Sequence, residues 1–340
     1  MSNDVVLEVK DLNVIYTTLR GDVKAVNDVS FSIKKGEVLG LAGESGCGKT
    51  TMGLALLRIL PSNGRITGGE IILDGQDIVK LSEQEMRKVR WKKISMVFQG
   101  ALNALNPVLK VGDQLAEVLM IHEGISKGEA LEIVRDLFIQ VGLDPGRIND
   151  YPHQLSGGMK QRVIIAMALE LNPAIVIADE PTTALDVTVQ AQVLDLMRKL
   201  QKRFGLSMIY ITHDLAVLAE IATKIAIMYA GYIVEYADVV GLYKRPIHPY
   251  TKGLIGSVPS IGHLKKRKLY SIPGAPPDQR FLPPGCPFAP RCPLATDKCR
   301  TELPELRAID GHLVRCHYAD DLKDTPAEEI WLKILEEKTS

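Results

Sequence analysis

The chain reads VLGLAGESGCGKT from Val38 to Thr50, an apolar run followed by a stretch rich in glycine. The run Val38–Ala42 has the length and the aliphatic side chains of a buried strand, and a helical pattern follows from Thr50 to Leu60. Between a strand and a helix, glycines let the backbone wrap around an anion with its N–H groups pointing inward, and the helix start adds positive potential. In this context the pattern predicts a loop that binds the phosphates of a nucleotide.

Two side chains at the end of this loop are expected to act on the phosphates. Lys49 would reach the β- and γ-phosphates, and the Thr50 hydroxyl would bind Mg²⁺. Cys47 fills a variable position of the loop, and no chemistry is assigned to its thiol. The competing interpretation is a chance glycine-rich turn, which the strand before the loop and the helix after it argue against.

A second apolar run, Ala174 to Asp179, ends in the two carboxylates Asp179 and Glu180. Ligands of parallel sheets bind at the carboxyl ends of the strands, so both side chains are candidates for the nucleotide site. Asp179 is predicted to hold Mg²⁺ through water, and Glu180 to orient or deprotonate the attacking water. Two acids that cap a buried strand and pair with nearby cations are the alternative, which the phosphate loop upstream disfavours.

A second candidate anion-binding helix end occurs at Leu155–Gln161, which reads LSGGMKQ. Ser156 is a good N-cap, and Gly157 and Gly158 open a helical pattern that runs to about Leu171. Two such helix ends in one chain are unexpected unless they face different nucleotides. With the two earlier motifs in this order, LSGG resembles the signature of the ABC ATPases. Members of that family dimerise head to tail, so that the signature of one chain contacts the ATP held by its partner.

The resemblance implies an α/β fold of the P-loop NTPase type and a set of site residues. Its catalytic positions match Glu180, the switch histidine His213 and the Mg²⁺-sensing Gln99, and Mg²⁺ would be bound by Thr50 and Gln99. Its nucleotide-binding positions match Tyr16, Gly43, Ser45, Gly46, Cys47, Gly48, Lys49, Thr50, Thr51, Asp179, Ser156, Gly157, Gly158 and Asp186.

Three of these assignments have ordinary structural alternatives. Tyr16 would stack on adenine, or it would be a strand aromatic that faces the core. His213 stands just past an apolar run, although a lone histidine is more often structural. Gln99 alone would be an unremarkable polar residue at a strand end. Gly100 and Thr183 depart from the residues usual in relatives (an acid and a serine), but neither departure removes a catalytic group.

The organisation of the chain predicts two parts. Residues 1–255 alternate β-rich and helical patterns, which indicates a largely parallel sheet, with a helical subdomain inserted at about 100–160. Ser126 and Glu129 form a plausible capping box in this insertion. Residues 256–340 form an irregular C-terminal region, because prolines punctuate the chain after Tyr243 and disfavour regular structure. A short helix is expected near the end. The elements expected elsewhere are strands at Ile94–Gln99, Ala174–Asp179 and Ser207–Thr212 and helices at Val187–Phe204, Leu215–Ala222 and Ala327–Glu337.

Charge and hydropathy limit the function classes. Lys plus Arg and Asp plus Glu both number 41, so the balance offers no bulk attraction to nucleic acid, and no nucleic-acid partner is expected. No apolar stretch reaches the length of a membrane span, and no basic and apolar leader is visible at the N-terminus. We therefore expect a cytoplasmic protein that, if it serves a membrane machine, docks on other chains.

Two further stretches are similar to the dipeptide and oligopeptide importer branch of the ABC family: Pro181–Gln192 and Arg245–Lys252, which reads RPIHPYTK. The resemblance implies an ATPase at the cytoplasmic face of the membrane, bound to two transmembrane permease subunits. A second ATPase subunit, a paralogue or another copy, would complete the dimer, and an extracellular binding protein would act indirectly. The branch also handles nickel and oligosaccharides. The alternatives are a soluble ABC ATPase that serves no transporter, which usually has coiled-coil arms or two ATPase units, and a non-hydrolysing regulatory subunit.

Four of the five cysteines, Cys286, Cys292, Cys299 and Cys316, crowd into the C-terminal region. In a cytosolic protein such a cluster suggests metal binding rather than disulfides. The spacing lacks the close pairs typical of structural zinc and suits a [4Fe–4S] cluster with four thiolate ligands, which relatives with this pattern are thought to carry. Zinc, with His312 or His317 as substitute ligands, and unliganded thiols remain the alternatives.

Overall fold

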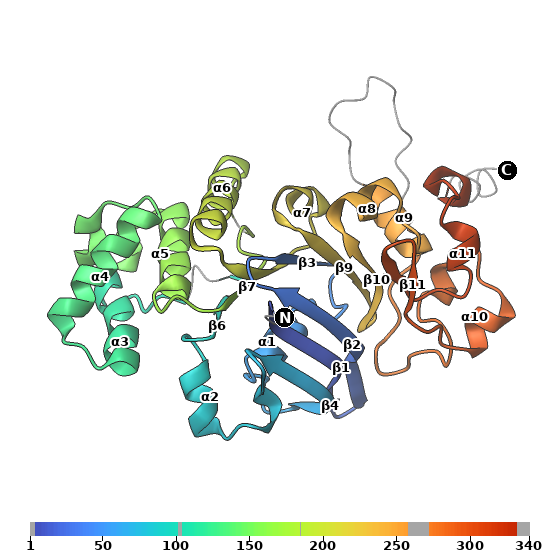
Figure 1. The fold of residues 1–340 in the computed structure, drawn as a ribbon, viewed down its shortest axis with the longest axis horizontal. Coiled ribbons are helices and arrows are strands. Elements are labelled where there is room, and N and C mark those ends of the chain that lie inside the picture. The colour runs from blue at the N-terminus through green and yellow to red at the C-terminus, as the bar shows by residue number, and fades with distance from the viewer. Residues whose placement is uncertain (1–3, 101–103, 184, 258–271, 332–340) are drawn as a thin grey trace.

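The computed structural model describes residues 4–100, 104–183, 185–257 and 272–331. Its centre is an eight-stranded sheet in the order β11-β12-β10-β9-β3-β8-β7-β6 (Figure 1). The stretch from β9 to β6 is parallel, and β10, β12 and β11 extend it in antiparallel fashion. The strands are β3 (Val38–Ala42), β6 (Ile94–Val97), β7 (Ile175–Asp179), β8 (Ser207–Ile211), β9 (Lys224–Tyr229), β10 (Tyr232–Asp238), β11 (Arg307–Ile309) and β12 (His312–Val314).

A second, antiparallel sheet with the order β2-β1-β4-β5 covers one face of the first, which the sequence analysis did not anticipate. Its strands are β1 (Val5–Thr18), β2 (Gly21–Lys34), β4 (Gly64–Leu73) and β5 (Gln76–Asp77). Helix α1 (Lys49–Leu56) shares a buried apolar core with both sheets, to which β7 contributes Ile175 and Ile177. Because side chains alternate along a strand, Val176 and Ala178 face the opposite core, under the helices of the other side.

Helices cover that other face, and Figure 1 shows α6, α7 and α8 along it. Helices α3 and α4 pack on each other at one end of the molecule, within the segment where an inserted helical pattern was expected, and the predicted capping box of Ser126 and Glu129 is confirmed. The further helices are α2 (Glu83–Val89), α3 (Val111–Glu123), α4 (Lys127–Gln140), α5 (Gly157–Leu169), α6 (Val187–Phe204), α7 (Leu215–Ile221), α8 (Val239–Lys244), α9 (Pro249–Gly256), α10 (Asp297–Thr301) and α11 (Ala319–Leu322).

The expectation of little regular structure after Tyr243 is wrong in part. Helix α9 begins at Pro249, because proline at the first helical position lacks only an N–H group that would have no helical partner. Strand β12 pairs with β10 and so joins the tail to the central sheet. Residues 327–331 are helical, and the remainder of the helix expected there lies outside the described residues. The described prolines that follow α9 lie mainly in the connections between helices and strands.

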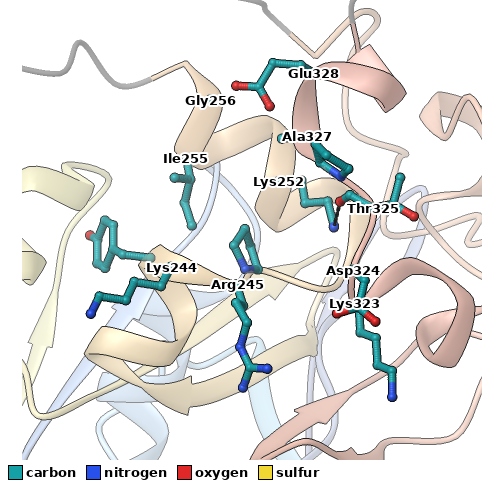
Figure 2. Close-up of a pocket in the computed structure, with 13 residues that line it drawn as sticks. Lys244, Arg245, Lys252, Ile255, Gly256, Lys323, Asp324, Thr325, Ala327 and Glu328 are labelled. Carbon is teal, nitrogen blue, oxygen red and sulfur yellow. Dashed lines mark hydrogen bonds between the residues drawn. The ribbon is translucent and has the colours of Figure 1, made fainter. Parts of the chain in front are cut away.

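The RPIHPYTK stretch fastens this tail to the core. The fully buried carboxylate of Glu235 in β10 accepts hydrogen bonds at 2.9 Å from the backbone N–H groups of Ile247 and His248, and His312 Nδ1 lies 2.8 Å from it. Lys252 Nζ donates to the carbonyl oxygens of Leu322, at 2.8 Å, and of Thr325. Figure 2 shows Lys252 pointing toward Thr325 beside a cavity of about 390 Å³, whose lining includes no residue of the glycine-rich loop.

Glu170, which follows α5, is buried without a hydrogen-bond partner for either carboxylate oxygen among the described residues. Burial raises its pKa from 4.5 to about 9. The folded chain therefore holds this proton more tightly than the unfolded chain, and the free energy of unfolding falls as the pH rises from 4.5 toward 9.

We expect Glu170→Gln to stabilise the chain by about 4 to 5 kcal/mol at pH 8 and by less than about 1 kcal/mol at pH 5, because at pH 8 folding forces this carboxyl group to take up a proton that it has lost in the unfolded chain. Urea unfolding of the variant and the original chain at both pH values measures this difference. A difference that does not change with pH would show that the Glu170 carboxylate is already stabilised in the folded state.

Candidate nucleotide-binding and hydrolysis site

The glycine-rich loop connects β3 to α1 at the centre of the molecule, and two of its glycines have no room for a side chain. A Cβ atom at Gly43, where φ is +149°, would lie 2.2 Å from the Met228 carbonyl oxygen. At Gly48, where φ is +108°, it would lie 2.1 Å from the Ala25 carbonyl oxygen. Both positions require glycine for the conformation as well as for the space. The loop is therefore fixed against the backbone on two sides, with its end at the start of α1.

Lys49 lies over this loop. Its Nζ atom donates to the carbonyl oxygens of Gly43, at 2.7 Å, and Glu44, at 3.0 Å, and its side chain is largely buried. The ammonium group thus stands inside the curve of the loop, where an anion would meet both it and the backbone N–H groups. Cys47 is also buried, which raises the pKa of its thiol, so this cysteine stays protonated.

A cavity of about 370 Å³ opens over the loop, and it brings together many of the predicted residues. The Tyr16 hydroxyl donates to Thr51 Oγ1 at 3.2 Å at its edge. Three lining residues, Val23, Ala25 and Gln279, were not predicted, because they belong to no motif and lie outside the loop in sequence. The lining residues are Tyr16, Val23, Ala25, Ser45, Gly46, Gly48, Lys49, Thr50, Thr51, Gln99, Glu180 and Gln279.

Asp179 ends β7 close to the loop and is fully buried. Burial raises the pKa of its carboxyl group, and Glu180 adds to this effect, while Thr50 and Lys49 oppose it. Although Thr50 is close enough to lower this pKa, neither carboxylate oxygen has a well-formed hydrogen bond within the described part of the chain. Orphaned carboxylate oxygens beside a threonine hydroxyl are suitable ligands for Mg²⁺. The residues present therefore fit the predicted ion.

The carboxylate of Glu180 is contacted by three side chains whose contacts could not be derived from the sequence. Its Oε2 atom accepts from Gln99 Nε2 at 3.0 Å and from Thr183 Oγ1 at 2.9 Å, and its Oε1 atom lies 2.9 Å from His213 Nδ1. Burial alone would raise its pKa, but the hydrogen bonds from His213 and Thr183 outweigh burial and hold the pKa below its usual value. The backbone of Glu180 has φ of +45°, a conformation uncommon for residues other than glycine. Such strain is typical of functional sites.

The LSGG segment lies apart from this cavity. Ser156 caps α5 by accepting from the Met159 N–H group at 3.3 Å, and Asp186 caps α6 by accepting from Val189 N at 3.0 Å. A Cβ atom at Gly158 would lie 2.7 Å from a Val189 methyl group, so the two helix starts are packed together. None of Ser156, Gly157, Gly158 and Asp186 lines the cavity over the phosphate loop. Ala184 lies outside the described residues.

The four C-terminal cysteines line one small cavity together with His248, Phe288 and His317. Burial raises the pKa values of Cys286 and Cys292 to about 12 and that of Cys316 to about 11. The predicted metal centre is not found: among the described residues, no group of three or more His, Cys, Asp or Glu side chains is arranged to hold a metal ion. The four cysteines lie around one cavity without forming such a group.

Comparisons with known proteins identify the family of the chain. The ABC transporter family profile matches residues 26–183, and the profile of the oligopeptide/dipeptide transporter C-terminal region matches residues 234–299. The oligopeptide transport ATP-binding protein OppD of Escherichia coli (strain K12) is 47% identical over 315 residues, covering 92% of this chain and 93% of OppD. The dipeptide transport ATP-binding protein DppD of Bacillus subtilis (strain 168) is 47% identical over 319 residues, covering 93% of this chain and 95% of DppD.

Solved structures show the same fold. The ATP-binding cassette MJ0796, solved as a dimer bound to ADP and Pi, is 30% identical, with a TM-score of 0.60 over 68% of this chain and 98% of that one. The protein cbiO1 from Clostridium perfringens, part of the ABC transporter complex cbiONQ, is 26% identical, with a TM-score of 0.61 over 71% of this chain and 92% of its own. No helix in the described ranges is long and apolar enough to span a bilayer. The chain belongs to the ABC transporter family of ATPases, in the branch formed by the ATP-binding subunits of oligopeptide and dipeptide importers.

Proposed function

We propose that this ATPase powers the import of peptides, and that its site residues act as their geometry indicates. The observation that carries the proposal is the carboxylate of Glu180, held by Gln99, Thr183 and His213 at the edge of the phosphate-loop cavity. The peptide substrate rests on relatives named for oligopeptide and dipeptide transport that match nearly the whole chain. Nickel and oligosaccharides are the alternative substrates, because the selecting surfaces belong to other subunits.

The phosphate loop and Lys49 hold the triphosphate, and Tyr16 stacks on the base at the cavity edge. Lys49 already stands inside the loop, so it exchanges two carbonyl contacts for phosphate oxygens when the nucleotide enters. Thr50 and Gln99 would bind Mg²⁺ and Asp179 would hold it through water, and the ion would neutralise charge on the β- and γ-phosphates. The two buried carboxylate oxygens of Asp179 then gain the partners that they lack within the described residues.

Glu180 positions the attacking water and accepts its proton. A carboxylate with a lowered pKa is ionised at neutral pH and is therefore a ready hydrogen-bond acceptor. Gln99, Thr183 and His213 restrict the rotation of this carboxylate, so the water that it holds has a fixed direction toward the γ-phosphate. His213 also stands where it can donate to the γ-phosphate once the nucleotide is bound.

The catalytic unit is a dimer in which each nucleotide lies between two chains. Ser156, Gly157, Gly158 and Asp186 are outside the cavity of their own chain, which supports their use on the ATP of a partner. The dimeric MJ0796 cassette bound to ADP and Pi is a precedent in a related protein. The second subunit is a paralogue or another copy of this chain. The dimer closes on ATP and opens after hydrolysis, and this cycle drives the transporter.

The dimer works at the cytoplasmic face of the membrane, bound to two transmembrane permease subunits and served indirectly by an extracellular binding protein. The names of the relatives as transport ATP-binding proteins support this placement.

Residues 1–255, with the helical subdomain at about 100–160, form the nucleotide-binding part, and 256–340 form the importer-type C-terminal region. The match of the oligopeptide/dipeptide C-terminal profile to residues 234–299 supports the second part.

The four cysteines would hold a [4Fe–4S] cluster that serves as a structural clip for the C-terminal region. The support is that all four thiols line one cavity and that four thiolates are the ligand set of such a cluster. Zinc, with His312 or His317 as substitute ligands, is the alternative, and among the described residues no group of three or more His, Cys, Asp or Glu is arranged to hold a metal ion. Cluster assembly would require these thiols to lose their protons, against the raised pKa values that burial gives them.

Replacing Glu180 by glutamine is expected to lower the ATPase rate at least 100-fold while ATP binding persists, because the amide keeps the shape and cannot accept the proton. With MgATP the variant is expected to accumulate as a closed dimer, alone or with its paralogue. Phosphate release and light scattering measure the two effects. Turnover close to that of the original chain would contradict the role of Glu180.

Replacing Thr183 by valine is expected to raise the pKa of Glu180. The Thr183 hydroxyl donates a hydrogen bond that stabilises the ionised carboxylate, and valine cannot make it. The loss of kcat/KM on acidification should then begin at a pH higher by up to about 1 unit. Thr183→Ser, which keeps the hydroxyl, is the matched control and should follow the original profile. Coincident profiles for the valine variant and the original chain would argue against this hydrogen bond.

Chain purified without oxygen is expected to contain about four irons and four acid-labile sulfides. Cys299→Ser should lower both contents, whereas Cys47→Ser should not, because Cys47 lies in the phosphate loop, away from the cavity of the four cysteines. Iron, sulfide and zinc are measured in the original chain and in both variants. Zinc alone, or no metal, would contradict the cluster and leave the nucleotide site unaffected.

A further inference from the structure

A glutamine of the C-terminal region reaches the phosphate loop. Gln279 Nε2 donates to the Gly46 carbonyl oxygen at 2.9 Å, across 233 positions of sequence. The backbone carbonyl of Gln279 accepts from Lys24 N at 3.1 Å, so the residue is anchored on β2 as well. Its side chain lines the nucleotide cavity next to Ser45 and Lys49.

A buried arginine of the same region holds the loop two residues earlier, at Glu44. Arg291 Nη1 and Nη2 donate to the two carboxylate oxygens of Glu44 at 2.6 and 2.9 Å. The Arg291 side chain is only 5% exposed, and its Nε atom donates to the Pro273 carbonyl at 2.9 Å. The Glu44 N–H group donates to the Tyr250 hydroxyl at 3.0 Å. The tip of the loop is therefore held by hydrogen bonds from the C-terminal half of the chain.

The contact of Gln279 is made at a part of the phosphate loop that close packing does not hold in place. Gly46 has φ of +80°, and a Cβ atom there would have no heavy atom within 4 Å, whereas Gly43 and Gly48 are in close contact with neighbouring backbone. The C=O and N–H of one trans peptide point in opposite directions. Gln279, by holding the Gly46 carbonyl, therefore also sets the direction of the Cys47 N–H group, which points to the Glu44 carbonyl at 3.3 Å.

We propose that Gln279 and Arg291 are positioning residues for the nucleotide: they hold the free tip of the phosphate loop in the conformation that accepts the phosphates, so the C-terminal region sets nucleotide affinity within its own chain. The inference rests on the proposed nucleotide site and adds residues outside the motifs of the ATPase core. Pre-organisation of this kind lowers the ordering cost of binding, and it leaves Glu180 and its partners untouched.

The test compares Gln279→Ala with Arg280→Ala in the full-length chain. Arg280 is adjacent and pairs with Asp278, and within the described residues it does not line the cavity over the loop. Calorimetry with MgADP is expected to give a Kd about fivefold to tenfold higher for Gln279→Ala, the effect of one lost hydrogen bond, and an unchanged Kd for Arg280→Ala. In steady-state ATP hydrolysis, KM should rise with the Kd while kcat stays within about twofold.

The variant Arg291→Lys provides an independent test, because it keeps the positive charge and loses the bidentate hydrogen bonds to Glu44. It should weaken MgADP binding with an unfolding temperature close to that of the original chain. A lower unfolding temperature with unchanged Kd would mean that Arg291 only fastens the tail, which overturns its role. Equal Kd values for Gln279→Ala and the original chain overturn the role of Gln279. Failure of the original chain to bind MgADP would instead overturn the nucleotide site itself.

Discussion

The close approach of the phosphate loop to its neighbouring backbone is the constraint on which the site depends. Met228 in β9 and Ala25 in β2 leave no space for a Cβ atom at Gly43 and Gly48, so the loop is wedged between the central sheet and the antiparallel sheet. This close packing on two sides fixes the start of α1 and directs Lys49 back over the loop. A substitution in either strand that moved those carbonyls would change the shape of the anion site without touching the motif.

The parallel register then gathers the remaining groups. Strands β7 and β8 pair with Asp179 opposite Ile211, so Glu180 and His213, which follow their strands, meet at the same sheet edge. Gln99 arrives from beyond β6, next to β7. The LSGG helix and α6 start elsewhere, in contact with each other and outside the cavity over the phosphate loop. We propose that one chain presents these helix starts to the nucleotide bound by another chain. The C-terminal region is coupled to this arrangement through Glu235, Lys252 and Arg291.

Motifs and periodicity predicted much of this arrangement. Local patterns predicted the phosphate loop, the acidic strand end, helix α6 at Val187–Phe204 and the capping box at Ser126. Each of these features depends on residues that are close to one another in sequence. The antiparallel sheet, Gln279 and Arg291 were missed, because their contacts join segments far apart in sequence and carry no local signal. Helix α9 was missed because proline was counted against structure, although Pro249 stands where a helix tolerates it.

We propose that the LSGG helix of one chain and the phosphate loop of another share one nucleotide. A structure of the full-length chain in its closed dimer with MgATP, as a homodimer or with its paralogue, measures this directly. We expect the γ-phosphate held by Lys49 to contact the LSGG helix start of the partner, and Ser156 of the same chain to stay outside hydrogen-bond distance. A γ-phosphate bound by Lys49 and Ser156 of one chain, or a closed dimer with the nucleotide exposed on its surface, would contradict it.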